Sequence, residues 1–134
     1  MSLADFHTLV LPRYYLSGPM SGLPDCNYPT FAKAAAELRA QGYDVLSAHE
    51  IEHFGETTPG AGLLPWTRYL RDDMRELLQC DAIILLEGWP QSKGARLELT
   101  TALALEMPVF FWDAHRKELL CMNLQPPAAE VKTA

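Results

Sequence analysis

The chain has 134 residues, which suffices for one domain with a substantial core. Hydrophobic residues make up 49% and charged residues 21%, as in an ordinary soluble globular protein. The formal net charge of −6 argues against a partner that is a nucleic acid polymer, because sequence-independent binding needs clustered Lys and Arg. A small phosphorylated ligand stays compatible with this charge, since it needs only one local anion site.

The chain predicts a strand, a helix and a second strand in its first half. Residues 13–17 form the first strand, which ends at Gly18 and Pro19. The helix runs over residues 29–42, with a proline in its first position and a glycine as its stop. Its apolar stripe consists of Phe31, Ala34, Ala35 and Leu38. The second strand covers residues 43–47.

The second half predicts two further strand and helix pairs. After a long loop rich in Gly and Pro at 52–64, the expected elements are a helix at 65–79, a strand at 81–87, a helix at 95–106, a strand at 108–112 and a last helical turn or two at 113–120. The strand at 81–87 is apolar without alternation, as in a central strand that is covered on both faces. The buried side of the helix at 65–79 is expected to carry Trp66, Leu70, Met74, Leu77 and Leu78.

This alternation predicts a single doubly wound α/β domain over residues 1–123, followed by a disordered tail at 124–134. The sheet is expected to have four or five parallel strands with helices on both faces. Ligands of such sheets bind beyond the carboxyl ends of the strands, where strand order reverses. Three loops are therefore candidates for the site: residues 17–22, 47–53 and 87–98.

The third of these loops carries the densest set of candidate residues. Ser92 and Gly94 stand where a helix is about to start, so a hydroxyl and free backbone N–H groups form an anion site. Lys93 and Arg96 add positive charge beside it. Glu98 shares a helix face with Ala and Leu residues, which predicts that its carboxylate points into a cleft. The alternative is a solvated helix glutamate.

Two other elements contribute candidate polar groups. Asp73 is predicted on the buried stripe of its helix, with Asp72 towards the flank. A carboxylate on an apolar stripe needs a partner or a raised pKa, and the alternative is a partly exposed aspartate paired with a neighbouring arginine. The first loop offers the hydroxyls of Tyr15, Ser17 and Ser21, although an ordinary turn explains its glycines equally well.

Taken together, three segments resemble the nucleoside 2-deoxyribosyltransferase-like superfamily: YYLSGPMSGLP, YLRDDMRELLQCDAIILLEGW and SKGARLE. The resemblance covers residues 14–112. Relevant branches of this superfamily include deoxynucleoside 5′-monophosphate N-glycosidases and a branch of short proteins frequent in phages and prophages. It implies a Rossmann-like or flavodoxin-like fold, a homo-oligomer, and no metal or organic cofactor.

The resemblance also implies roles for individual residues. Glu98 matches the nucleophile on the anomeric carbon, Asp73 an acid/base or base-positioning group, and Tyr15 the tyrosine that orients the nucleophile. Residues expected at the sugar and 5′-phosphate are Gly18, Ser21, Gly22, Ser92, Gly94 and Arg96, and those on the base side are His49, Glu50 and Trp89. These residue types suit glycosidic cleavage, whose oxocarbenium-like transition state a carboxylate can trap.

One departure from the transferase branch bears on the substrate. An acidic residue commonly precedes the loop glycine there, whereas this chain has Ser92 and Lys93. A cation near the 5′ position favours a nucleoside 5′-monophosphate over a nucleoside, and hydrolysis over base exchange. A non-catalytic protein that binds or senses nucleotides on the same fold is the alternative function.

The segment HEIEH, residues 49–53, has the spacing of a zinc-metalloprotease motif. It follows a strand directly and leaves room for barely two helical turns. Glu56 and Pro59 stand where the extended motif has its glycine and third histidine. A zinc hydrolase is therefore a distant alternative, and HEIEH is interpreted as a chance pattern in a substrate-facing loop.

Two features indicate the compartment. Three cysteines at unrelated spacings favour a reducing environment. The N-terminus lacks a basic region and a cleavage site of small residues, and no apolar run reaches the ~20 residues that span a bilayer. The sequence predicts a cytoplasmic protein without a membrane partner.

Overall fold

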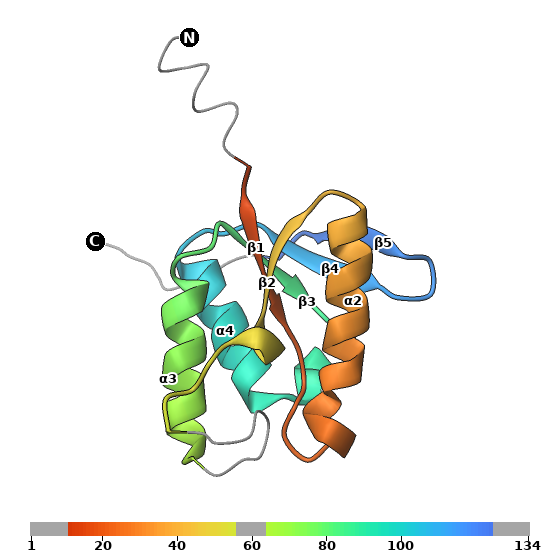
Figure 1. Ribbon diagram of the computed structural model, residues 1–134. Coiled ribbons are helices and arrows are strands. Elements are labelled where there is room, and N and C mark those ends of the chain that lie inside the picture. Colours follow the sequence, from red (N-terminus) through yellow and green to blue (C-terminus); the bar gives the residue numbers. More distant parts are fainter. Residues whose placement is uncertain (1–10, 56–63, 125–134) are drawn as a thin grey trace, which may run out of the picture.

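A computed structural model describes residues 11–55 and 64–124 and places five strands in one sheet, in the order β2-β1-β3-β4-β5 (Figure 1). The strands are β1 (Arg13–Ser17), β2 (Asp44–Ser47), β3 (Ala82–Leu85), β4 (Val109–Asp113) and β5 (Glu118–Met122). The helices are α2 (Tyr28–Ala40), α3 (Trp66–Leu77) and α4 (Lys93–Ala104), with short 3-10 turns at η1 (Pro24–Asn27), η2 (Ala48–Glu50) and η3 (Trp89–Gln91).

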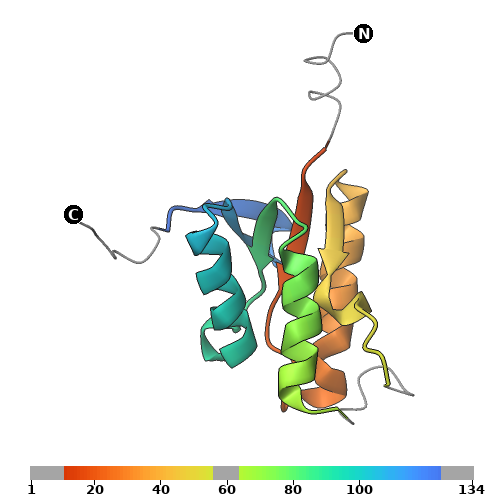
Figure 2. The same cartoon turned by 90° about the vertical axis from the view of Figure 1, so that its left-hand side faces the viewer.

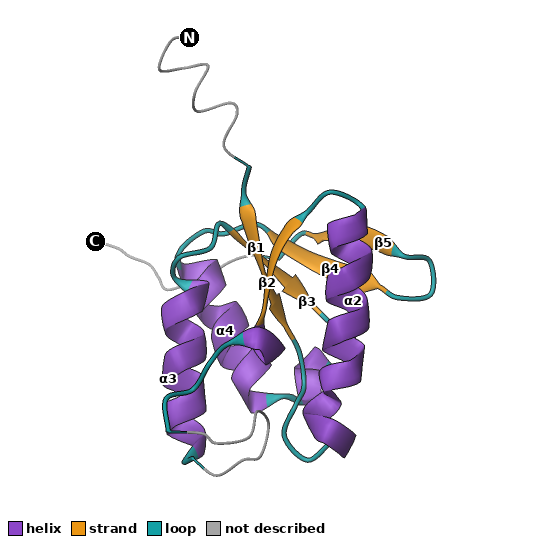
Figure 3. Cartoon of the chain, viewed as in Figure 1, coloured by secondary structure: helices purple, strands orange, loops and turns teal. Residues whose placement is uncertain are grey.

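Strands and helices alternate along most of the chain, as the sequence predicts (Figure 3). The helix α2 covers one face of the sheet, whereas α3 and α4 pack together on the other (Figure 2). This placement follows from right-handed crossovers between parallel strands. The doubly wound α/β fold is thus confirmed. Apart from the helical turns expected at 113–120, the predicted element ends lie within two residues of the observed ones.

The hydrophobic core lies between the helices and the central strands. All four residues of β3 are buried, as its continuous apolar run predicts. The predicted stripe of α2, formed by Phe31, Ala34, Ala35 and Leu38, is buried as well. The helix ends at Ala40, and Gly42 follows with a φ of +98°, which suits glycine because other residues are strained there.

The C-terminal part of the sheet differs from the prediction. Strands β2, β1, β3 and β4 are parallel, but β5 pairs antiparallel with β4, in the segment where a helical turn is expected. The Asp113 carboxylate accepts hydrogen bonds from the backbone N–H groups of His115 (3.0 Å) and Arg116 (3.1 Å). Lys117 closes the turn with a φ of +54°. These local bonds favour a tight hairpin over a helix.

The prediction for α3 is partly wrong. Leu77 is buried, but Leu78 lies past the helix end and is 57% exposed, and Trp66 is exposed at the first turn. Asp72, which was expected on the flank, is buried. The helix is amphipathic, yet its inner side is shared between the core and a polar cavity, so apolar periodicity alone misplaces these residues.

Among the described residues, no helix has the length and apolar character needed to cross a membrane. The predicted tail, apart from Leu124, and positions 56–63 of the predicted long loop lie outside the described residues.

Candidate active site

A cavity of about 530 Å³ lies beyond the carboxyl ends of β1, β2 and β3, at the edge that the strand order predicts. Its walls come from the loop after β1, the segment after β2, the inner side of α3 and the first turns of α4. Its volume falls within the roughly 300–1,000 Å³ of typical small-molecule sites. Tyr28, Trp66 and Tyr69 give the cavity aromatic walls.

The most constrained group in this cavity is the carboxylate of Glu98. The Tyr15 hydroxyl donates a hydrogen bond to Oε2 (2.8 Å) and the Ser17 hydroxyl donates one to Oε1 (2.6 Å). Tyr15 and Ser17 are two residues apart on β1, so both side chains point to the face that α4 covers. Glu98 is only 4% exposed. The carboxylate is therefore held through both oxygens at the floor of the cavity.

Burial and hydrogen bonding act in opposite directions on this carboxyl group. Burial raises the pKa of Glu98, and the hydrogen bonds from Ser17 and Tyr15 lower it, so that the net pKa stays above its ordinary value. Burial and the charges of Glu98 and Asp73 raise the pKa of Tyr15 well above its ordinary value. Tyr15 therefore remains a protonated donor to Glu98.

Asp73 is a second carboxyl group in the cavity wall. Its side chain is 17% exposed, and its Oδ1 has no hydrogen-bond partner within the described part of the chain. Burial, followed by the charges of Glu98 and Asp72, raises the pKa of Asp73 to about 8. Asp73 thus holds a proton at neutral pH, which fits a group that donates a proton to a substrate.

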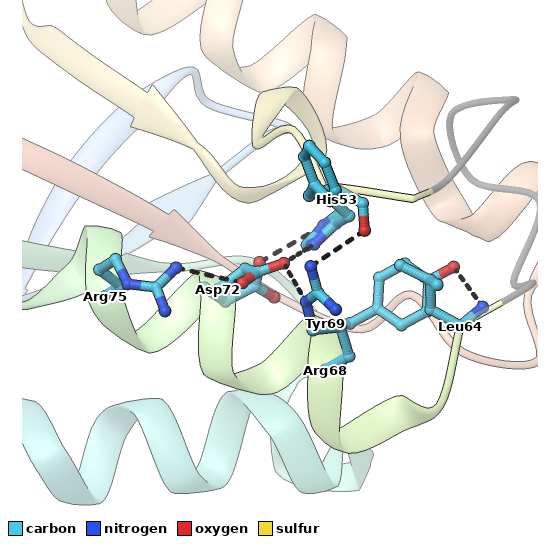
Figure 4. Close-up of polar contacts among 8 residues, drawn as sticks. His53, Leu64, Arg68, Tyr69, Asp72 and Arg75 are labelled. Carbon is cyan, nitrogen blue, oxygen red and sulfur yellow. Dashed lines mark hydrogen bonds and ion pairs between the residues drawn. The ribbon is translucent and has the colours of Figure 1, made fainter.

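The sequence left open that Asp73 pairs with a neighbouring arginine. In the structure it is Asp72, not Asp73, that contacts the arginines (Figure 4). It binds Arg75 Nη1 at 3.2 Å, Arg68 Nε at 3.5 Å and His53 Nδ1 at 2.9 Å. Burial raises the pKa of Asp72, but the hydrogen bonds from His53 and Arg75 and the charge of Arg68 outweigh it, and the net pKa is lowered. Two adjacent aspartates therefore differ in protonation.

The first turn of α4 forms one wall of the cavity. Ser92 is the N-cap, and its hydroxyl accepts a hydrogen bond from the Ala95 backbone N–H (3.1 Å). The Lys93 ammonium lies 4.7 Å from the centre of a ring of Trp66, at the start of α3. The N–H groups and dipole of this turn, together with Lys93, make this end of the cavity suitable for an anion.

Most predicted site residues lie in or directly behind the cavity. Its lining includes Gly18, Ser21, Asp73, Ser92, Gly94 and Glu98, with Tyr15 behind Glu98. Five predicted residues are not part of the lining: Gly22, His49, Glu50, Trp89 and Arg96. Arg96 donates to the Pro90 carbonyl (2.8 Å), and Glu50 forms an ion pair with Arg39 (2.6 Å). Their polar groups are thus engaged elsewhere.

Two residues of this site make contacts that the sequence analysis does not predict. Ser17 is expected there only as one of the hydroxyls of the first loop, whereas the structure shows that it holds Glu98; its place two residues after Tyr15 on a strand was the available signal. His53 reaches the cavity from the loop after β2 and contacts α3. Nothing in the sequence pairs it with Asp72, because the two positions are connected only through the fold.

The segment HEIEH does not form the helix that a zinc site of this kind needs. A 3-10 turn ends at Glu50 and the backbone is extended at Ile51, so the two histidines do not share a helix face. His49 contacts the Ser47 hydroxyl (2.5 Å), whereas His53 contacts Asp72. Over residues 11–55 and 64–124, no three His, Cys, Asp or Glu side chains cluster as metal ligands would.

Comparison with known proteins places this architecture among nucleoside 2-deoxyribosyltransferase-like folds. The structure resembles that of a 2-deoxyribosyltransferase from Bacillus psychrosaccharolyticus with a TM-score of 0.55 and 19% sequence identity, covering 74% of this chain and 70% of that one. Residues 12–111 match the family described as "Domain of unknown function (DUF4406)", and the chain belongs to this family. No curated protein matches the sequence.

Proposed function

We propose that this protein cleaves the N-glycosidic bond of a nucleoside 5′-monophosphate, whose sugar is ribose or deoxyribose, with Glu98 as the nucleophile. The observation that carries the proposal is the fixed Glu98 carboxylate, held by Tyr15 and Ser17 in a cavity that also contains Asp73, whose pKa burial and nearby charges raise to about 8. A positioned carboxylate beside a carboxylic acid is the pair that retaining glycosidases use.

The reaction would proceed in two steps. The Glu98 carboxylate attacks C1′ while the bond from C1′ to the base nitrogen breaks, and the base leaves with the bonding electrons and the Asp73 proton. Water then attacks C1′, its proton passes to Asp73, and the bond between C1′ and Glu98 breaks. Both carboxyl groups return to their starting states, and the products are the free base and the sugar 5-phosphate.

The wall formed by α4 supports a monophosphate as substrate. Ser92 and Gly94 line the cavity there, and the backbone N–H groups of the first turn favour an anion. Lys93 adds a positive charge at the same wall. A nucleoside would leave these groups without a charged partner, which is why we prefer the nucleotide.

Base release from a panel of ribo- and deoxyribonucleoside 5′-monophosphates, followed by chromatography, tests the proposal. We expect release of one or a few bases, undiminished by a chelator. Glu98→Gln should lower kcat by on the order of 10⁴-fold, as loss of a nucleophile does elsewhere. Glu106→Gln, at an exposed glutamate past the end of α4, is the matched control and should leave kcat unchanged.

The outcomes separate the candidate functions. Binding of a nucleotide without base release from any member of the panel would refute the glycosidase and favour the nucleotide-binding protein. Release only when a second free base is added would instead indicate transfer. The expected homo-oligomer and the cytoplasmic location stay predictions, and sedimentation of the full chain would test the former.

A further inference from the structure

His53 occupies an unusual position between the two aspartates of α3. Its side chain is 5% exposed, lines the cavity and packs with its ring edge against Tyr69, at 4.6 Å between ring centres (Figure 4). One ring nitrogen, Nδ1, lies 2.9 Å from Asp72 Oδ2. The other, Nε2, lies 3.8 Å from Asp73 Oδ1. Each nitrogen therefore faces a different carboxyl group.

The contacts of Asp72 determine which ring nitrogen carries the proton. Asp72 accepts a hydrogen bond from Arg75 through Oδ1 and has Arg68 close to Oδ2. With two cations at this distance the carboxyl group is ionised, and an ionised carboxylate only accepts hydrogen bonds. The short contact with His53 therefore requires a proton on Nδ1. In the neutral ring, Nε2 is then a bare acceptor.

The acceptor atom Nε2 faces Asp73, a carboxyl group that can donate a proton. Asp73 Oδ1 lacks a hydrogen-bond partner among the residues described, and Asp73 holds its proton at neutral pH. The distance of 3.8 Å is too long for a hydrogen bond, and the two atoms must approach by at least about 0.6 Å, through rotation of the side chains, to form one. One proton then has two alternative sites, the Asp73 carboxyl group and Nε2.

We propose that His53 is a positioning residue for Asp73, and that the two side chains hold one shared proton in the cavity while Asp72 anchors the ring. Its role in base release rests on the proposed function; the shared proton does not. During the reaction the departing base takes this proton from Asp73. The attacking water returns one to the pair in the second step, so the proton balance of the cycle is unchanged.

Other charged and titratable groups face this pair from each neighbouring element, and they set the background against which the proton is held. They are Glu98 on α4, Tyr15 on β1, and Asp72, Arg68 and Tyr69 on α3. Glu98 and Asp72 are negative and favour keeping the proton on the pair. Arg68 is directed at Asp72, which limits its effect on Asp73.

Nitrogen NMR of the full chain tests the shared proton without any substrate. We expect His53 to carry hydrogen on Nδ1 and none on Nε2 when the ring is neutral, and its Nε2 signal to shift in Asp73→Asn, which lacks the carboxyl proton. Asp72→Asn should remove the preference for hydrogen on Nδ1. A neutral ring with hydrogen on Nε2 in the wild type, or an Nε2 signal unaltered by Asp73→Asn, would overturn the proposal.

Kinetics test the positioning role. His53→Asn retains a donor near Asp72 but lacks Nε2, so a purely structural histidine would be rescued by this change. We expect kcat for base release at pH 8 to fall at least about tenfold with KM changed less than about threefold, and activity to be lost at a lower pH than in the wild type. His115→Asn, at an exposed histidine in the β4–β5 turn, is the control.

The two experiments fail separately. If the wild type releases no base while the NMR spectra show the shared proton, the proposed function is wrong and the pair is correct. If base release is normal and His53→Asn is as active as the wild type at every pH, the positioning role is wrong and the glycosidase stands.

Discussion

Asp72 and Asp73 are neighbours on α3 whose carboxyl groups meet opposite environments, and their effects on stability should differ in sign. The pKa of Asp73 is about 8, above its ordinary value of 3.8, so the folded protein holds a proton that the unfolded chain loses. Stability is unaffected near pH 4 and declines as the pH rises to 8, by linkage. Asp73→Asn should remove this penalty and stabilise the protein by a few kcal/mol at pH 9. Urea unfolding of the wild type and the variant at pH 5 and pH 9 measures this difference in the free energy of unfolding.

The substitution Asp72→Asn is the matched test at the next position. The pKa of Asp72 is lowered by its partners, so its contribution is present above the ordinary value and is lost as the pH falls. Asn cannot pair with Arg68, Arg75 and His53 as a carboxylate does. We expect a loss of about 1–3 kcal/mol at pH 7. Equal effects of both substitutions would contradict the assigned protonation states.

At the scale of elements, two glycines of the cavity wall have different reasons to be glycine. A Cβ on Gly18 would lie 2.9 Å from Leu86 Cβ and 3.3 Å from Phe31 Cζ, because the end of β1 packs closely on the chain after β3. Among the residues that the structure describes, a Cβ on Gly94 would meet only the Trp66 ring, at 3.9 Å. Gly18→Ala should therefore cost about 1–3 kcal/mol in unfolding free energy.

Gly94→Ala should instead preserve or raise stability by up to about 1 kcal/mol, because alanine favours a helix more than glycine does. If base release falls in this variant while the thermal midpoint does not, the backbone of α4 approaches the ligand at Gly94. If Gly18→Ala and Gly94→Ala destabilised the protein equally, the close contact of Gly18 with Leu86 would not be a reason for glycine at position 18.

The elements also show how far a sequence-based prediction reaches. Periodicity and punctuation placed α2, β3 and the cavity edge because these depend on burial patterns within one segment. The hairpin to β5 escaped prediction, since Asp113 and Lys117 form its turn without a glycine. The pairing of His53 with Asp72 escaped as well, because it joins a loop to a helix 19 positions away. Contacts between segments leave little trace in either segment alone.

At the scale of the whole molecule, the sheet order brings three chain segments to one edge, and each supplies a different chemical function. The β1 strand presents the hydroxyls that hold Glu98, α3 presents Asp73, and α4 presents both Glu98 and its own N-terminal turn. The loop after β2 adds His53. Because the strands meet only in the folded sheet, the candidate site is a property of the topology rather than of any motif.

If Glu98 is the nucleophile and Asp73 the acid, as proposed above, kcat/KM should show a bell-shaped dependence on pH. Glu98 must be ionised to attack, and because its pKa is raised by burial, activity should rise with pH through a range above that of an ordinary glutamate. Asp73 must be protonated to release the base, so activity should fall as the pH passes about 8. In Asp73→Asn the alkaline fall should vanish along with most of the rate, by about 10²-fold or more. The rates of both proteins between pH 4 and 10 decide the matter, because an alkaline fall that persists in Asp73→Asn would assign the acid to another group.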